Sequence, residues 1–245
     1  MTTLVLTAHG SADPRSAANA RAIAGHLVQM RPGLDVRLAF CEHNSPSLAQ
    51  VLAGLAAEHQ APKAVVTPLL LANAYHARID IPGQIANCAN DVSGIHVSQA
   101  AVLGEDDRLV SVLRQRVTEL GTTRRDPTLG VLVVSIGSSN RAANARTGRV
   151  APKLATGTCW AAVTTAFATR PEPSLAGAVE QLRSRGARRV IIAPWFLAPG
   201  RVPDRVGLFA RNANIAMAAP LGAHPLVAAT VLDRFDQAKA KRLAA

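Results

Sequence analysis

Short runs of apolar, mostly β-branched residues recur along the first half of the chain and predict buried strands. These runs cover residues 4–8, 36–40, 64–71 and 95–100. Because successive positions are apolar, with no polar residues alternating between them, we expect the strands to be covered on both faces. Burial on both faces is typical of a parallel sheet enclosed by helices.

Helix-forming stretches separate these runs. Asp13 followed by Pro14 is a helix-start signal. A second start is expected at Ser45 and Pro46, because the residues that follow are apolar at i, i+3, i+4 and i+7. A third helix is expected over residues 107–120. The alternation of strands and helices predicts an α/β fold in which ligands bind at the carboxyl ends of the parallel strands.

The second half of the chain repeats the first. The stretch "TLVLTAHGSAD" matches "GVLVVSIGSSN", and "FCEHNSPSL" matches "FATRPEPSL" at the same offset. Pro68 then matches Pro194, and "AVLGED" and "APLGAH" close the two halves. Because these landmarks follow in one order at nearly one spacing, we predict an internal duplication. Each lobe is expected to hold a small parallel four-stranded sheet flanked by helices.

The stretch "GTTRRDP" supplies the boundary between the two lobes. Gly121 stands where a helix is expected to end, and Pro127 prevents its continuation. We therefore predict lobes at residues 1–121 and 128–245, joined by a linker at residues 122–127. Two such lobes are expected to face each other across a cleft.

The differences between the two copies indicate where the chemistry lies. Three polar residues of the first copy are replaced in the second, with His9, Glu42 and His76 aligned with Ile136, Thr169 and Val202. Each of the three follows a predicted strand end, and such ends meet at one edge of a parallel sheet. Two imidazoles and a carboxylate form a plausible open site for a divalent metal. One such histidine alone would more often be an ordinary polar residue at the edge, and His43 is an alternative ligand to Glu42.

Three further residues border this edge. Asp80 follows His76 by four residues and fits two roles equally, as a hydrogen-bond partner of that imidazole or as a helix N-cap. Arg15 and Arg78 are candidates for binding substrate carboxylates.

Charge and composition restrict the partners. The chain has 27 lysine and arginine residues against 16 aspartate and glutamate residues, which fits an anionic partner and equally fits simple solubility. Aromatic residues make up only 3%, which disfavours binding of single-stranded nucleic acid, and there is no dense basic block. The three cysteines are widely spaced, and we expect neither a disulfide framework nor a zinc site. We expect a cytoplasmic protein without a membrane segment.

The segments "AHGS", "FCEHNSPSL" and "PLLLANAYHARIDIP" resemble the class II tetrapyrrole chelatases of the CbiX/SirB type. The resemblance extends over essentially the whole chain. It implies insertion of Fe²⁺ or Co²⁺, with Ni²⁺ possible, into sirohydrochlorin during sirohaem or cobalamin biosynthesis. The metal is then a substrate, and no nucleotide or redox cofactor is needed.

The resemblance also assigns residues. It implies that His9 and His76 are catalytic and that both bind the metal together with Glu42. Sirohydrochlorin carries eight carboxylates, which arginines and backbone N–H groups would bind. The residues expected to contact it are Gly10, Ser11, Arg15, Arg78, Gly137 and Ser138, in a monomer or a homodimer.

The chain departs from the family pattern at Ala74, where a glycine is common. Two other function classes stay open at this stage. One is a noncatalytic carrier of metal or tetrapyrrole, which would use the same ligands. The other is a histidine phosphatase-like enzyme, which is disfavoured because Ala8 stands where that chemistry needs an arginine.

Overall fold

The computed structural model describes residues 2–58, 62–91, 94–169 and 173–243. The chain divides into two compact units. Unit 1 comprises Met1–Gly104 and Ala223–Ala245, and unit 2 comprises Glu105–Gly222. Within the described residues, no helix is both long and apolar enough to cross a membrane.

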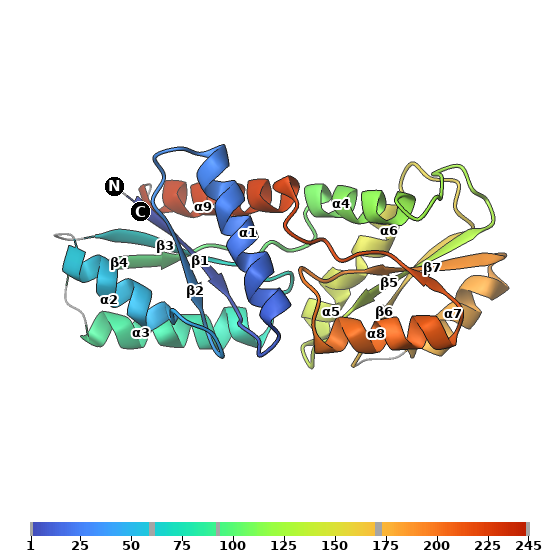
Figure 1. Cartoon of the computed structure of the whole chain (residues 1–245), viewed down its shortest axis with the longest axis horizontal. Helices are drawn as coiled ribbons and strands as arrows, with labels where there is room; N and C mark the ends of the chain where they lie inside the picture. Colours follow the sequence, from blue (N-terminus) through green and yellow to red (C-terminus); the bar gives the residue numbers. More distant parts are fainter. Residues whose placement is uncertain (1, 59–61, 92–93, 170–172, 244–245) are drawn as a thin grey trace. The chain divides into compact units, whose positions relative to one another are not determined.

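Unit 1 is built on a parallel sheet with the strand order β2-β1-β3-β4. Helices α1 and α9 cover one face of this sheet, and α2 and α3 cover the other (Figure 1). The strands are β1 (Thr2–Ala8), β2 (Val36–Phe40), β3 (Lys63–Pro68) and β4 (His96–Gln99). The helices are α1 (Pro14–Met30), α2 (Leu48–Glu58), the π-helical turn η1 (His76–Asp80), α3 (Ile81–Asp91) and α9 (Pro225–Leu243).

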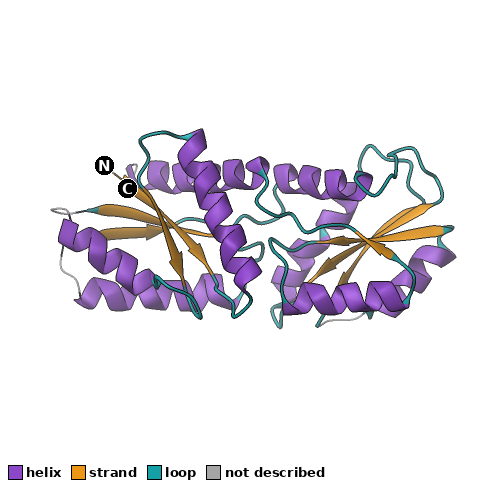
Figure 2. Ribbon diagram, viewed as in Figure 1, coloured by secondary structure: helices purple, strands orange, loops and turns teal. Residues whose placement is uncertain are grey.

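Unit 2 has the equivalent parallel sheet, with the order β6-β5-β7-β8. Helices again enclose the sheet (Figure 2). The strands are β5 (Leu129–Ser135), β6 (Ala162–Phe167), β7 (Arg189–Pro194) and β8 (Ala216–Met217). The helices are α4 (Asp107–Thr118), α5 (Arg141–Gly148), α6 (Val150–Ala155), α7 (Leu175–Ser184) and α8 (Arg201–Asn212). The matching strand orders confirm the predicted pair of four-stranded parallel sheets.

The two compact units do not coincide with the two halves of the sequence. The last helix of the first half belongs to unit 2, and the last helix of the second half belongs to unit 1. Helix α4 follows β4 in the chain, yet it packs on α6 and β7 of unit 2. Helix α9 follows β8, yet it packs on α1, β3 and β4 of unit 1. Arg234 on α9 stabilises this position of the helix, because its guanidinium donates to the backbone carbonyls of Val102 and Leu103. The lobes expected at residues 1–121 and 128–245 therefore describe the repeat in the sequence, whereas the compact units exchange one helix each.

Two predicted boundaries need correction. Helix α2 begins at Leu48, after the start expected at Ser45 and Pro46. The cap is Ser47, whose Oγ accepts from Gln50 N while its own N–H donates to Gln50 Oε1. This reciprocal pair is a capping box, in which both backbone N–H groups find a side-chain acceptor. Strand β3 ends at Pro68, short of residue 71. Leu69 is buried, and Leu70 and Leu71 are partly buried, in the loop that leads to η1.

Candidate metal centre

Three side chains of unit 1 meet at the carboxyl edge of its sheet. His9 follows β1, Glu42 follows β2, and His76 begins the turn after β3. These three strands are neighbours in the sheet, with β1 in the middle. One ligand atom from each residue lies within 4.8 Å of the other two. The convergence expected from the strand order is therefore present.

The backbone brings Glu42 close to His9. The N–H of Glu42 donates to the carbonyl of His9 over 2.9 Å, which extends the β1–β2 pairing past the strand ends. Gly10 follows with a φ of +94°, and a Cβ atom at this position would lie 1.8 Å from the carbonyl oxygen of Glu42. Only glycine leaves room for this approach.

His76 is oriented by Asp80. The Nδ1 atom of His76 lies 2.5 Å from Asp80 Oδ2, and both residues belong to the π-helical turn η1. A carboxylate partner at Nδ1 keeps the proton on that nitrogen and leaves the Nε2 lone pair available for a metal. Asp80 therefore acts as an imidazole partner. It is not the N-cap of α3, because the helical turn already begins at His76 and continues into α3.

The two histidines also affect each other. Their ring centroids are 3.9 Å apart, with an angle of 31° between the planes. Burial lowers the pKa of His9, the nearby His76 lowers it further, and the Glu42 carboxylate acts in the opposite direction. The Nδ1 atom of His9 is buried and has no hydrogen-bond partner among the described residues. A neutral imidazole with an unpartnered nitrogen is the form in which histidine binds a metal.

Two neighbours of Glu42 have other environments. His43 is exposed, and its Nε2 lies 3.4 Å from Glu42 Oε2. It does not join the group of three, although it lies close enough to contact a ligand of the same site. Burial, followed by the charges of Asp80 and Glu42, raises the pKa of the Cys41 thiol to about 11. Cys41 is therefore a neutral thiol at neutral pH and unsuited to act as a thiolate ligand.

The two arginines expected to bind substrate carboxylates lie in different environments. Arg15 is paired with Asp13, with 2.6 Å between Nη2 and Oδ2. Arg78 is exposed on η1, two residues from His76.

The serine backbone amides of the two Gly-Ser turns are already hydrogen-bonded to side chains. Ser11 N–H donates to Asn44 Oδ1 over 2.8 Å, and Ser138 N–H donates to Asn144 Oδ1 over 2.9 Å. Both preceding glycines have positive φ, +94° at Gly10 and +89° at Gly137. These two serine amides are therefore already paired, and a ligand carboxylate would have to replace an asparagine side chain to bind them.

Unit 2 keeps the backbone of this edge without its ligands. Thr169 N–H donates to the carbonyl of Ile136 over 3.0 Å, the same bond that joins Glu42 to His9 in unit 1. The Thr169 hydroxyl donates to that carbonyl as well. Ile136 is half exposed, and Val202 packs beside the core of the unit. Among the described residues, the His9, Glu42 and His76 cluster is the one group suited to hold a metal.

Two residues beside the cluster were not predicted. The side chain of Tyr75 is 64% exposed, and its ring meets that of His76 edge-on at 6.0 Å. Gln99 on β4 donates from Nε2 to the carbonyl of Ala77 in η1 over 2.8 Å. Neither residue belongs to a recognisable motif. The only signal for Gln99 was the comparison of the two copies, since the second copy has Met217 at the matching place in "HVSQA" and "NIAMA".

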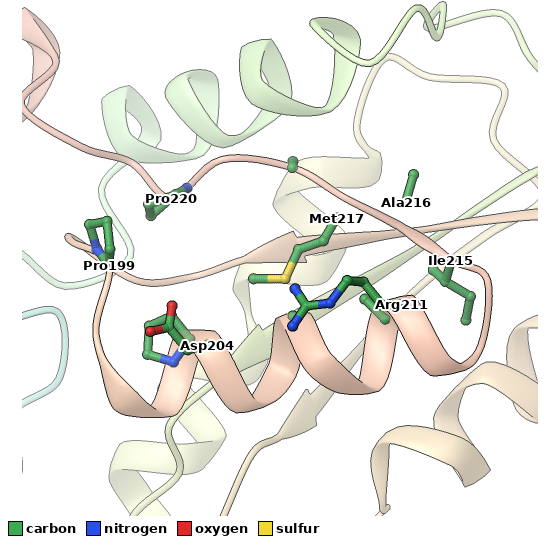
Figure 3. Close-up of a pocket in the computed structure, with 11 residues that line it drawn as sticks. Pro199, Asp204, Arg211, Ile215, Ala216, Met217 and Pro220 are labelled. Atoms are coloured by element: carbon green, nitrogen blue, oxygen red, sulfur yellow. The ribbon is translucent and has the colours of Figure 1, made fainter.

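A cavity of about 660 Å³ lies in unit 2, between α8 and the segment around β8. Figure 3 shows Asp204, Arg211 and Met217 among the residues lining it. None of the candidate site residues lines this cavity. The metal-ligand cluster of unit 1 is thus a separate feature.

Fold and site together define a duplicated parallel α/β protein in which one unit carries a cluster of two imidazoles and a carboxylate at its carboxyl edge. The chain belongs to the CbiX family, whose model matches residues 3–120 and again residues 130–238. The double match agrees with the internal duplication.

Related proteins fit this assignment. A sirohydrochlorin cobaltochelatase of Priestia megaterium is 24% identical over 97% of this chain and 80% of its own length. A sirohydrochlorin ferrochelatase of the same organism is 26% identical over 84% of this chain and 77% of its own length. The solved structure of SirB from Bacillus subtilis with Fe³⁺ matches with a TM-score of 0.87 at 20% identity, covering 99% of this chain and 97% of that one. The family follows from the family model, and the likeness to the solved structure shows the fold.

Proposed function

We propose that this protein is a sirohydrochlorin chelatase, an enzyme that inserts Fe²⁺ or Co²⁺ into the tetrapyrrole. The observation that carries the proposal is the cluster of His9, Glu42 and His76, with ligand atoms within 4.8 Å of one another. The related cobaltochelatase and ferrochelatase support both metals. Imidazole and carboxylate also accept Ni²⁺, so metal supply contributes to selection.

The metal is a substrate in this reaction. His9, Glu42 and His76 hold it, and three protein ligands leave positions open for the pyrrole nitrogens. Metal–nitrogen bonds form as the metal leaves the protein ligands, and the macrocycle releases two protons. Imidazoles that have just released the metal are suited to take up these protons, because a freed imidazole nitrogen is a good proton acceptor. No nucleotide or redox step is required.

The ligands differ in how firmly they are held. Asp80 fixes His76 through Nδ1, whereas the Nδ1 atom of His9 has no partner among the described residues. We propose Asp80 as the residue that orients His76 and increases its basicity as a ligand. The anionic macrocycle is expected near Arg78 and Arg15, and the turns at Gly10–Ser11 and Gly137–Ser138 stay predicted contacts. For Arg15, binding a carboxylate would mean exchanging its partner Asp13.

The test is an anaerobic assay that follows the visible spectrum of sirohydrochlorin with Fe²⁺, Co²⁺ and Ni²⁺ in parallel. We expect many turnovers with Fe²⁺ or Co²⁺. His9→Ala and His76→Ala should each abolish insertion while the circular dichroism spectrum and the melting temperature stay near those of the wild type. His26→Ala is the matched control and should retain most of the activity, since His26 lies on α1 and does not belong to the cluster.

Two outcomes would contradict the proposal. A spectral change that stops at one equivalent of protein would identify a noncatalytic carrier. Full turnover by the His9→Ala/His76→Ala double variant would show that the cluster is not the insertion site.

A further inference from the structure

The turn that carries His76 has an unusual hydrogen-bond pattern. Ile81 N–H donates to the carbonyl of His76, five residues back, and not to Ala77, four residues back. Pro82 explains this pattern, because its ring would clash with the carbonyl of Arg78 in a regular α-helix. Pro82 also has no N–H to offer the carbonyl of Ala77. That carbonyl therefore loses both the α-helical and the π-helical donor.

Gln99 supplies the missing donor. Its Nε2 lies 2.8 Å from the Ala77 oxygen, and it reaches that oxygen from β4, the strand next to β3. Ala77 is buried, so an unpaired carbonyl would be costly there. The Oε1 atom of Gln99 is itself buried without a partner among the described residues. The Gln99 side chain thus leaves its Oε1 atom unpaired while its Nε2 atom donates to the Ala77 carbonyl. We infer that this donation is the reason for the glutamine.

The second copy provides an internal control. Strand register pairs Val66 with Gln99 in unit 1 and Ile192 with Met217 in unit 2, so Gln99 and Met217 hold equivalent places. Helix α8, the counterpart of η1 and α3, is a regular α-helix. Its proline, Pro203, lies in the first turn, where no N–H donor is needed.

Figure 3 shows the Met217 side chain lying over α8. A thioether has no hydrogen to donate to a carbonyl. The glutamine thus occurs in the copy that has the π-helical turn, the histidine and the aspartate. The copy with a regular helix has methionine.

We propose that Gln99 is a positioning residue for the metal centre. By holding the Ala77 carbonyl, its amide fixes the π-helical turn and so keeps Asp80 against His76. Gln99 does not contact the metal. This inference rests on the proposed function only for its effect on metal binding, because the effect on the turn is a property of the protein alone.

The test compares Gln99→Met, which introduces the residue of the second copy, with Gln99→Leu. Amide hydrogen exchange of the metal-free protein is measured by mass spectrometry for the peptides covering residues 74–84. Both variants should exchange faster there than the wild type, with little change elsewhere. The affinity for Co²⁺, measured by titration without tetrapyrrole, should fall about tenfold, as is usual when a partner of a metal ligand is disturbed. Ser98→Ala is the matched control, because Ser98 is the neighbouring residue on β4 and its side chain points to the opposite face.

A double-mutant cycle separates positioning from general destabilisation. In an Asp80→Asn background, Gln99→Met should reduce Co²⁺ affinity much less than in the wild type, because the alignment it protects is already lost. Additive effects would overturn the proposal, as would wild-type exchange and wild-type Co²⁺ affinity in both Gln99 variants. If the wild type itself neither binds Co²⁺ nor inserts it, the proposed function fails, and the exchange measurement still decides whether Gln99 holds the turn.

Discussion

Asp80 Oδ2 lies 2.5 Å from His76 Nδ1, within a single π-helical turn. Asp80→Asn should weaken Co²⁺ binding by about 10-fold to 100-fold, because an amide cannot stabilise the proton on Nδ1 as a carboxylate does. Titration calorimetry of the metal-free protein with Co²⁺ measures this. Asp35→Asn is the control, since Asp35 pairs with Arg37 at the opposite edge of the same sheet. Equal losses in the two variants would contradict the role of Asp80.

Gly10 is expected to tolerate no side chain. Gly10→Ala should destabilise unit 1 by clearly more than about 1 kcal/mol, because it adds a clash with the Glu42 carbonyl to the cost of a positive φ. Gly33→Ala is the matched control, since Gly33 has a φ of +85° and no described atom lies within 4 Å of its added Cβ. Urea unfolding measures both. The difference in unfolding free energy between the two variants gives the cost of the clash. Equal losses would mean that the loop at Glu42 moves aside at little cost.

Acid is expected to destabilise the metal-free protein partly through His9. Burial and His76 lower the folded-state pKa below the ordinary value of 6.5, so the unfolded chain binds the proton more readily. Above pH 6.5 both states are neutral at this residue, and its contribution is constant. As the pH falls below 6.5 the folded state loses stability, until the pH passes the lowered pKa. The free energy of unfolding of the wild type should therefore fall more steeply in this window than that of His9→Gln, and parallel curves would contradict the shift.

The cysteines should react in an order set by their surroundings. Cys41 has a pKa raised to about 11, and Cys159 is exposed. Iodoacetamide at pH 8 should therefore alkylate Cys159 well before Cys41, because the thiolate is the reactive form. Peptide mass spectrometry over time follows both sites in one sample. Equal rates would show that the edge beside Glu42 opens more than the structure indicates.

Much of the site was readable from the two copies of the sequence. His9, Glu42 and His76 stood out because Ile136, Thr169 and Val202 replace them, and strand ends in a parallel sheet converge. The sequence also indicates Asp80 as a candidate, but it leaves the role undecided between an imidazole partner and a helix cap. Local spacing allows both roles, and only the hydrogen bonding of η1 distinguishes them.

Other features could not be read in this way because they depend on contacts between distant segments. Gln99 holds the carbonyl of Ala77 from another strand, and Asn44 takes the amide of Ser11 from across the sheet edge. The sequence predicts the start of the second helix too early, because Pro46 gives a stronger local signal than Ser47, which caps α2.

The sequence by itself determined the strand-and-helix alternation and the duplication, and it singled out the three clustered side chains. Each of these follows from periodicity or from comparing one half with the other. Tertiary structure decided that α4 and α9 are exchanged between the units and that Pro82 turns the start of α3 into a π-helical turn held by β4. The physical reason is that local sequence determines which backbone groups pair within a helix or a strand. Backbone groups without a partner in their own element bond to residues from distant parts of the chain, and only the tertiary structure determines which residues these are.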